Sequence, residues 1–398
     1  MTTRAGPEPR RGLLVAGLGL TQILAWGGTY FAPSVLGPAM ERDLGLPTGG
    51  ALAGVTLMLG VGGALAPRVG RALDALGPRR VLAAGSVAMA LGIALLAASR
   101  GPLTMALAWA ALGVAGAMAL SEAAQAALAR GATPAEARRG IGTLALVSGA
   151  CTLVAWPALA LLEARLGWRG ALLAAAALHL AVSLPLHLAL LPGGPSGADP
   201  RAARAPPADG PLPRRLRLLS AALAAQVLAT GGALPHAIAV LEDGMALPRD
   251  AAVAVGALLG PAQVAARALE LAFGRRVRAS ALASAALVAI PLGLLLPLAL
   301  SGTAGALAFV AAFGLASGAM AVLRPACLIE VHGGTEGYAT VAGRVMAPVV
   351  WAMALGPTLF TALLWLGGAR WGMALALGAS AAAALVGLAL LRGAVRGA

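Results

Sequence analysis

The chain has 398 residues, of which 60% are hydrophobic and only 11% are charged, and its mean hydropathy is +0.87. Such a composition excludes a soluble globular protein, because too few polar residues remain to cover its surface. The formal net charge of +14 is spread along the chain. No single basic domain exists, which argues against a nucleic-acid partner.

Long apolar runs recur through the whole sequence, and each can supply the ~20 residues that a membrane-spanning helix needs. The runs are continuous rather than alternating, so strands are not expected. We therefore predict an all-α polytopic membrane protein, embedded in a lipid bilayer, with twelve spans. In chain order they are residues 12–36, 50–69, 81–99, 103–128, 140–162, 170–191, 218–240, 251–273, 281–300, 303–327, 340–366 and 370–391.

One segment between these runs is too polar and too rich in proline to span a membrane. It reads LPGGPSGADPRAARAPPADGPLP, at 191–213, and its composition is typical of a linker. It predicts an N-terminal six-helix bundle at 1–190, a linker at 191–217 and a C-terminal six-helix bundle at 218–398. Most arginines fall in loops on the linker's side of the membrane, which predicts cytoplasmic termini and a cytoplasmic linker.

The two halves repeat each other. QILAWGG begins at Gln22 and QVLATGG begins at Gln226, each in the first span of its half. RALDALGPRR begins at Arg71 and RALELAFGRR begins at Arg267. Matches in the same order at a nearly constant offset indicate a duplicated six-helix unit.

The segment GRALDALGPRR, at 70–80, resembles the signature between helices 2 and 3 of the major facilitator superfamily. Ala75 departs from that signature, where the family usually has a basic residue. The resemblance implies two bundles related by a pseudo-two-fold axis and transport by alternating access. The resemblance assigns a gating role to the residues that match the signature and to Glu270, which is the counterpart of Asp74 in the second half. The alternative is that the arginines of this segment only fix the orientation of the chain in the membrane. The expected gating residues are Gly70, Asp74, Gly77, Arg79, Arg80 and Glu270.

Further stretches, such as WGGTYFAPSVLGPAM and EGYATVAGR, are similar to bacterial members of the superfamily related to monocarboxylate transporters. This resemblance implies a monomer in the bacterial plasma (inner) membrane that carries a small organic anion, coupled to protons. In that relative, helix 8 carries an Asp and an Arg four residues apart. Here Arg267 matches the Arg, but Gln263 stands at the Asp position. Glu270, three residues after Arg267, can pair with it on one helical face, and such a structural pair is the alternative to a substrate contact.

In this superfamily helices 1, 4, 7 and 10 line the central cavity, and polar groups inside a span usually face a cavity or each other. Gln22, Trp26 and Tyr30 share one helical face because they are four residues apart. Hydrogen bonds between helices and anchoring at the membrane interface are the structural alternatives. The expected substrate-binding residues are Gln22, Trp26, Tyr30, Gln226, His236, Arg267 and Arg324.

Glu122 and His236 are candidate proton carriers, since a carboxylate or an imidazole inside a span can exchange a proton. For Glu122 the alternative is a salt bridge with Arg130 or Arg139. We expect His179 and His187 to pack without a functional role.

Two other functions stay open at this point. Proton-driven efflux of an apolar or cationic drug-like compound would use Glu122 as the counter-charge. A polytopic membrane enzyme is a remote alternative, because no paired carboxylates, metal-ligand set or nucleophile–base pair stands out. We therefore expect no enzyme activity, no metal and no cofactor.

Overall fold

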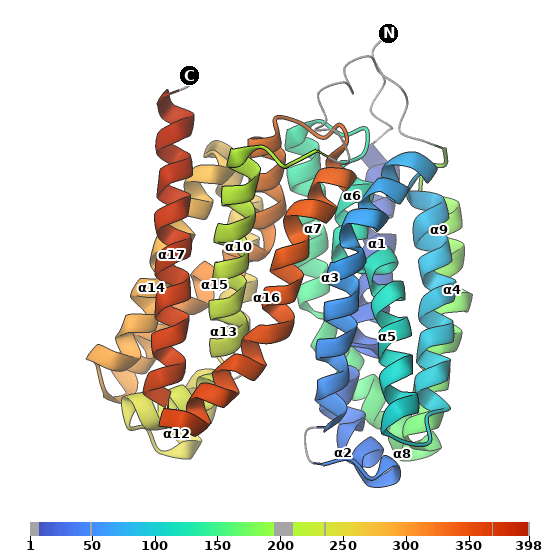
Figure 1. Cartoon of the computed structure of the whole chain (residues 1–398), viewed down its shortest axis with the longest axis horizontal. Helices are drawn as coiled ribbons and strands as arrows, with labels where there is room; N and C mark the ends of the chain where they lie inside the picture. Colours follow the sequence, from blue (N-terminus) through green and yellow to red (C-terminus); the bar gives the residue numbers. More distant parts are fainter. Residues whose placement is uncertain (1–7, 48–49, 195–209, 235, 368, 397–398) are drawn as a thin grey trace. The chain divides into compact units, whose positions relative to one another are not determined.

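The computed structural model describes residues 8–47, 50–194, 210–234, 236–367 and 369–396, and over these ranges its regular structure is helical (Figure 1). The chain divides into two compact units. The first comprises residues 1–210 together with 335–347, and the second comprises 211–334 and 348–398. Residues 195–209, most of the predicted linker, lie outside the described residues.

The helices of the first unit follow the predicted spans, with breaks that the apolar pattern does not reveal. The helix α8 contains a turn at Gly167, whose φ of +68° favours glycine. The segment η1 is a π-helix. In chain order the elements are α1 (Glu8–Gly28), α2 (Ala32–Leu44), α3 (Gly50–Leu76), α4 (Pro78–Ala97), α5 (Pro102–Ala119), α6 (Ser121–Ala129), α7 (Pro134–Gly149), α8 (Cys151–Leu178), η1 (His179–Ser183) and α9 (Leu184–Leu190).

The second unit has the same kind of elements, with a second π-helical segment, η3, and a short 3₁₀ turn, η4. Helix α16 begins in the first unit, through residues 338–347, and continues in the second. The elements are α10 (Arg214–Ala233), α11 (Ala237–Ala239), η3 (Val240–Gly244), α12 (Arg249–Gly256), α13 (Leu259–Phe273), η4 (Gly274–Arg276), α14 (Ala279–Ala299), α15 (Gly302–His332), α16 (Tyr338–Gly367) and α17 (Ala369–Arg396).

Ten helical stretches among the described residues are long and apolar enough to cross a membrane. One of them, Pro134–Leu190, runs through the two predicted spans at 140–162 and 170–191. The last predicted span, at 370–391, contains a shorter apolar helix, Gly372–Gly387. A multi-pass helical membrane protein is thus confirmed, and the number twelve stays a prediction.

Local sequence signals set several helix starts. Proline occupies the first turn of α4, α5 and α7, where its missing N–H is not needed. At the start of α7, Thr133 and Glu136 form a capping box, in which each side chain accepts the other's backbone N–H. Glu136 also forms an ion pair with Arg11 of α1, at 2.5 Å.

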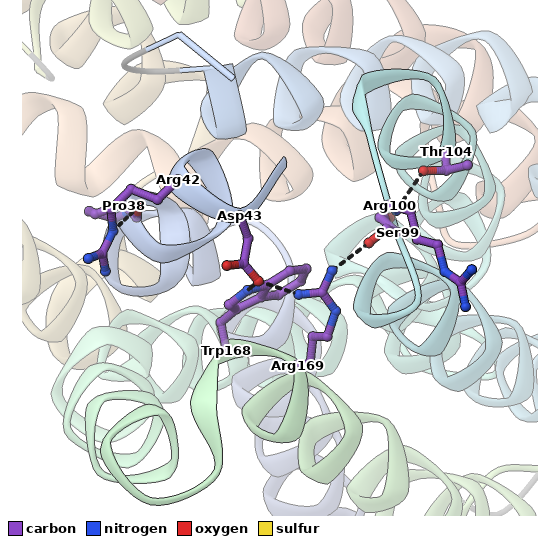
Figure 2. Close-up of polar contacts among 8 residues, drawn as sticks. All are labelled: Pro38, Arg42, Asp43, Ser99, Arg100, Thr104, Trp168 and Arg169. Atoms are coloured by element: carbon purple, nitrogen blue, oxygen red, sulfur yellow. Dashed lines mark hydrogen bonds and ion pairs between the residues drawn. The ribbon is translucent and has the colours of Figure 1, made fainter. Parts of the chain in front are cut away.

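A polar cluster joins three loops at one end of the first unit (Figure 2). Asp43, at the end of α2, accepts hydrogen bonds from the indole of Trp168 at 2.9 Å and from Arg169 at 2.5 Å. Arg169 also donates to the backbone carbonyl of Ser99 at 2.8 Å, and its guanidinium lies 4.1 Å from the Trp168 ring centroid. The chain segments that join the predicted spans 12–36 and 50–69, 81–99 and 103–128, and 140–162 and 170–191 therefore meet at one end of this unit.

Candidate functional site

Gln22 of α1 contacts a break in the helix that was predicted at 103–128. The break is at Leu120, whose backbone is extended, and it separates α5 from α6. The Gln22 side chain is fully buried and donates its amide N–H to the carbonyl of Ala119 at 2.8 Å. Its Oε1 is buried without a hydrogen-bond partner among the described residues. An acceptor held in this way can receive a hydrogen bond from a ligand.

Trp26, one turn further along α1, reaches the same break. Its indole N–H donates to the hydroxyl of Ser121, the first residue of α6, at 3.0 Å. Tyr30 stacks edge-on against Trp26, with ring centroids 5.4 Å apart. Gln22 and Trp26 therefore lie one turn apart on α1 and both touch the break, whereas Tyr30, which was expected on the same helical face, lies in the turn after α1.

Glu122 follows directly at the second position of α6, where a negative charge interacts favourably with the helix dipole. Its side chain is partly exposed and lies within electrostatic range of the buried Tyr338 of α16. The salt bridge considered as the alternative, to Arg130 or Arg139, is not among the ion pairs of the described residues.

The start of α16 is held against the end of α3 within the first unit. Asp74 accepts a hydrogen bond from the backbone N–H of Thr340, near the N-terminus of α16, at 2.8 Å. The structure thus brings Asp74 to a helix N-terminus, where a carboxylate is stabilised by free N–H groups. Asp74 also lies within electrostatic range of Arg130, and burial lowers the pKa of Arg130 while the charge of Asp74 raises it.

Two glycines bring α3 and α16 into direct backbone contact. A Cβ on Gly70 would collide with the carbonyl of Ala339, and a Cβ on Gly343 would collide with the carbonyl of Ala66. A second contact joins this segment to the first unit, since the hydroxyl of Thr335 donates to the carbonyl of Ala132 at 2.7 Å.

The remaining signature residues separate into packed and exposed positions. Gly77 has a φ of +86°, and a side chain there would collide with the carbonyl of Gly194. Arg79 donates to the carbonyl of Leu191, the first residue of the predicted linker, at 2.7 Å. Arg80 is exposed and makes no polar contact with the residues that the structure describes.

In the second unit, Gln226 repeats the pattern of Gln22. Its amide N–H donates to the hydroxyl of Thr230 at 3.1 Å, and its Oε1 is buried without a hydrogen-bond partner in the described part of the chain. His236 bonds to the carbonyl of Gly232 at 2.8 Å and stacks on Phe360, with ring centroids 4.8 Å apart. Gln226 thus contacts its own helix, α10, whereas His236 contacts both α10 and α16.

Arg267 and Arg324 are brought together by two neighbouring helices of this unit. The Cβ of a residue at Gly314 would contact Leu259, and one at Gly318 would collide with the backbone of Gln263. Both pairs have the same offset of 55, so α13 and α15 run parallel. One turn further on, this register places Arg267 level with position 322. The charges of Arg267 and Arg324 accordingly interact, and Glu270 is buried in the next turn of α13.

Sequence reasoning missed several of these contacts. The break at Leu120 has a local signal, because Leu-Ser-Glu inside an apolar run is typical of a helix N-terminus. The cluster of Asp43, Trp168 and Arg169 and the contacts of His187 depend on residues from distant helices, for which one sequence offers no signal. His187 is buried and hydrogen-bonded through both ring nitrogens.

Comparisons with known proteins agree with this architecture. The human organic anion transporter MFSD10 (TETRAN) has a similar fold, with 19% sequence identity, a TM-score of 0.71, and coverage of 96% of this chain and 100% of that one. The *E. coli* fucose:proton symporter FucP is similar at 13% identity and a TM-score of 0.71, over 94% of this chain and 98% of that one. A structure of FucP in the outward conformation is similar at 12% identity and a TM-score of 0.71, over 94% of this chain and 98% of that one.

No curated protein sequence matches the chain. The family model described as Major Facilitator Superfamily matches residues 18–333, which is most of the chain. The chain belongs to the Major Facilitator Superfamily.

Proposed function

We propose that the chain is a secondary active transporter that carries a small organic anion, such as a monocarboxylate, by alternating access coupled to protons. It acts in the bacterial plasma membrane as a monomer, with both termini cytoplasmic. Its substrate contacts include Arg267 and Arg324 in the second unit, and Gln22 and Trp26 in the first. Members of the family are transporters, so the proposal concerns the substrate, the driving ion and the residues.

The observation that carries the proposal is the meeting of Arg267 and Arg324. Both lie in apolar helices, where a charged side chain costs at least ~2.5 kcal/mol on insertion scales. Their charges repel each other because the register of α13 and α15 brings them to one level. A carboxylate of the substrate would relieve this repulsion, since guanidinium groups bind carboxylates through paired N–H donors. The similar fold of the human organic anion transporter is compatible with this substrate class.

Proton coupling is the second part of the proposal. The similar fold of a fucose:proton symporter is compatible with it. Glu122 and His236 are the residues that the sequence nominates, and Glu122 lies at the break that Gln22 and Trp26 contact. The contact between Asp74 and Thr340 would act as the gate, because it holds the start of α16 to the first unit.

A second candidate is efflux of a cationic compound. It is favoured by Glu122, a partly exposed carboxylate two residues past the helix break and next in sequence to Ser121, which accepts the hydrogen bond from Trp26. The same experiment separates the two, because an anion transporter needs Arg267 whereas a cation exporter needs Glu122.

The test is a binding measurement on the purified protein, with radiolabelled lactate, benzoate and succinate as anions and tetraphenylphosphonium as the cation. We expect at least one anion to bind, and Arg267→Lys and Arg324→Lys each to weaken its binding by about ten-fold or more, because an ammonium lacks the guanidinium fork. Arg100→Lys, in an exposed loop, is the matched control and should bind normally. Binding of the cation alone, or full anion binding by Arg267→Lys, would overturn the proposal.

A further inference from the structure

His187 lies in a buried polar cluster between α9, α4 and α1. Its Nδ1 is 2.8 Å from the hydroxyl of Ser86 and 3.1 Å from the carbonyl of Leu82, both on α4. Its Nε2 is 3.2 Å from the hydroxyl of Thr21 on α1. The side chains of His187, Ser86 and Thr21 are each at most 2% exposed. The neighbours of this imidazole within hydrogen-bond distance are therefore oxygen atoms.

These partners bear on which nitrogen carries the proton in the neutral ring. A carbonyl can only accept, so the contact of Nδ1 with Leu82 is a hydrogen bond only in the Nδ1–H tautomer, in which the same N–H also meets the oxygen of Ser86. We take this tautomer as the expected one. Ser86 in turn donates to Leu82 at 3.2 Å. Nε2 is then the nitrogen with a lone pair, and it faces Thr21.

Thr21 can satisfy Nε2 in either protonation state by rotating its hydroxyl hydrogen. With a neutral ring, the hydroxyl donates to Nε2 at 3.2 Å. With a protonated ring, Nε2–H donates to the same oxygen, and the hydroxyl donates to the carbonyl of Leu18 at 2.9 Å. An imidazolium buried in an apolar span is costly unless both N–H groups find acceptors. Here both do, and no heavy atom has to move.

The backbone next to this cluster is irregular. Residues His179–Ser183 form a π-helical turn inside an otherwise α-helical span, and such turns occur frequently at functional sites. His179 is 2% exposed and hydrogen-bonds to the backbone of Leu24 on α1. Its Nε2 and the hydroxyl of Ser183 are buried without a hydrogen-bond partner among the described residues. The charges of the two histidines would repel, so protonation of one disfavours protonation of the other.

The other charged groups on the packed elements lie at helix ends. On α4 the nearest is Arg80, six residues from Ser86, or a little less than two turns. On α1 it is Arg11, ten residues from Thr21 and paired with Glu136. On α8 the charges are in the turn around Gly167, at least ten residues before His179. The described charged residues of these three helices are Arg11, Arg79, Arg80, Glu163, Arg165 and Arg169.

We propose that His187 is a proton-binding site of the first unit, that Nε2 is the atom that takes the proton, and that Thr21 is the hydroxyl that adapts to it. Its connection with transport rests on the proposed function: Thr21 precedes Gln22, so α1 presents one residue to the histidine and the next to the helix break. Protonation of His187 would thereby change the hydrogen bonding of Thr21 on α1, the helix that carries Gln22 and Trp26. Coupling would then involve a residue other than Glu122 or His236.

The test follows the four histidines of the chain by ¹⁵N NMR, with the full-length protein in lipid nanodiscs and a titration from pH 8 to pH 4. His187→Gln identifies the signal of His187. We expect the Nδ1–H tautomer at pH 8 and reversible protonation of Nε2 on acidification. The Nε2–H tautomer at pH 8, or a ring that stays neutral at pH 4, would overturn the proposal.

Thr21→Val provides the second readout, because valine has the shape of threonine but no hydroxyl. We expect it to move the protonation midpoint of His187 down by at least one pH unit. Thr29→Val is the matched control: Thr29 lies just past the end of α1, is also buried and donates to the carbonyl of Ala25. Equal midpoints in wild type and Thr21→Val would contradict the role of Thr21.

Transport gives a separate answer about coupling. In proteoliposomes, His187→Gln should lose lactate accumulation driven by a pH gradient while exchanging lactate at a rate within two-fold of wild type. Undiminished accumulation by this variant would overturn the coupling. If the wild type carries no organic anion, the proposed function fails, and the NMR titration still decides whether His187 binds a proton.

Discussion

The carboxylate of Asp74 accepts a hydrogen bond at 2.8 Å from the backbone N–H of Thr340, 266 residues later in the chain. Asp74 lies near the end of α3, and Thr340 lies in the first turn of α16. The signature segment at 70–80 therefore contacts the N-terminus of a helix.

We expect Asp74→Ala to slow transport by about ten-fold or more while leaving substrate affinity within two-fold of wild type, since a hydrogen bond to a charged group contributes ~1.5–3 kcal/mol. Rates of lactate exchange and equilibrium binding, measured on the same preparation, check this. Asp243→Ala, which removes an exposed carboxylate from η3, should change neither. A loss of binding by folded Asp74→Ala would instead place Asp74 in the substrate site.

Gly70→Ala should destabilise the contact between α3 and α16, because the new methyl group would meet the carbonyl of Ala339. Overpacking of this kind typically costs ~1–3 kcal/mol. We expect a lower Tm in a thermal-stability assay. Gly378→Ala on α17, where a Cβ would have nothing within 4 Å, is the control and should keep or raise the Tm. An unchanged Tm for Gly70→Ala would mean that the two helices separate easily.

Arg169 connects two loops, through Asp43 and the carbonyl of Ser99 (Figure 2). Arg169→Lys should lower the Tm, because a single ammonium group cannot reproduce both contacts of the guanidinium or its stacking on Trp168. The effects of Arg169→Lys and Asp43→Asn should be non-additive in a double-mutant cycle. Additive effects would show that the pair does not act as a unit.

Gln22→Leu should reduce substrate affinity by about ten-fold, because it removes the buried Oε1 that is available to a ligand. The Tm should change little, since the leucine fills the same space in an apolar environment. Thr29→Val, just past the end of the same helix, should bind substrate normally. Normal affinity in Gln22→Leu, together with a large fall in Tm, would show that Gln22 serves only to hold α1 against Ala119.

The sequence predicts the helical spans and the shared face of Gln22 and Trp26 well, because both follow from local periodicity and repetition, but the same periodicity does not reveal that α1 ends before Tyr30. The register of Asp74 within its signature is also local. The hydrogen-bond partner of Asp74 cannot be predicted locally, because Thr340 contributes its backbone N–H and every residue type except proline has one. His187 was expected to pack, since a lone histidine in an apolar run does not reveal the hydroxyls of Thr21 and Ser86 on other helices. Arg267 and Arg324 lie at a similar height along their helices because α13 and α15 approach closely at Gly318, and only the fold defines this approach.

The central claim is that an organic anion is moved by a proton gradient, and uptake of radiolabelled lactate, benzoate and succinate into proteoliposomes of wild-type protein tests it most directly. With an imposed pH gradient of one sign, the account predicts accumulation of at least one anion several-fold above the external concentration. A protonophore should abolish this accumulation, and Arg267→Lys should not show it. Equilibration of every anion without accumulation under gradients of both signs, or accumulation of tetraphenylphosphonium alone, would contradict the account.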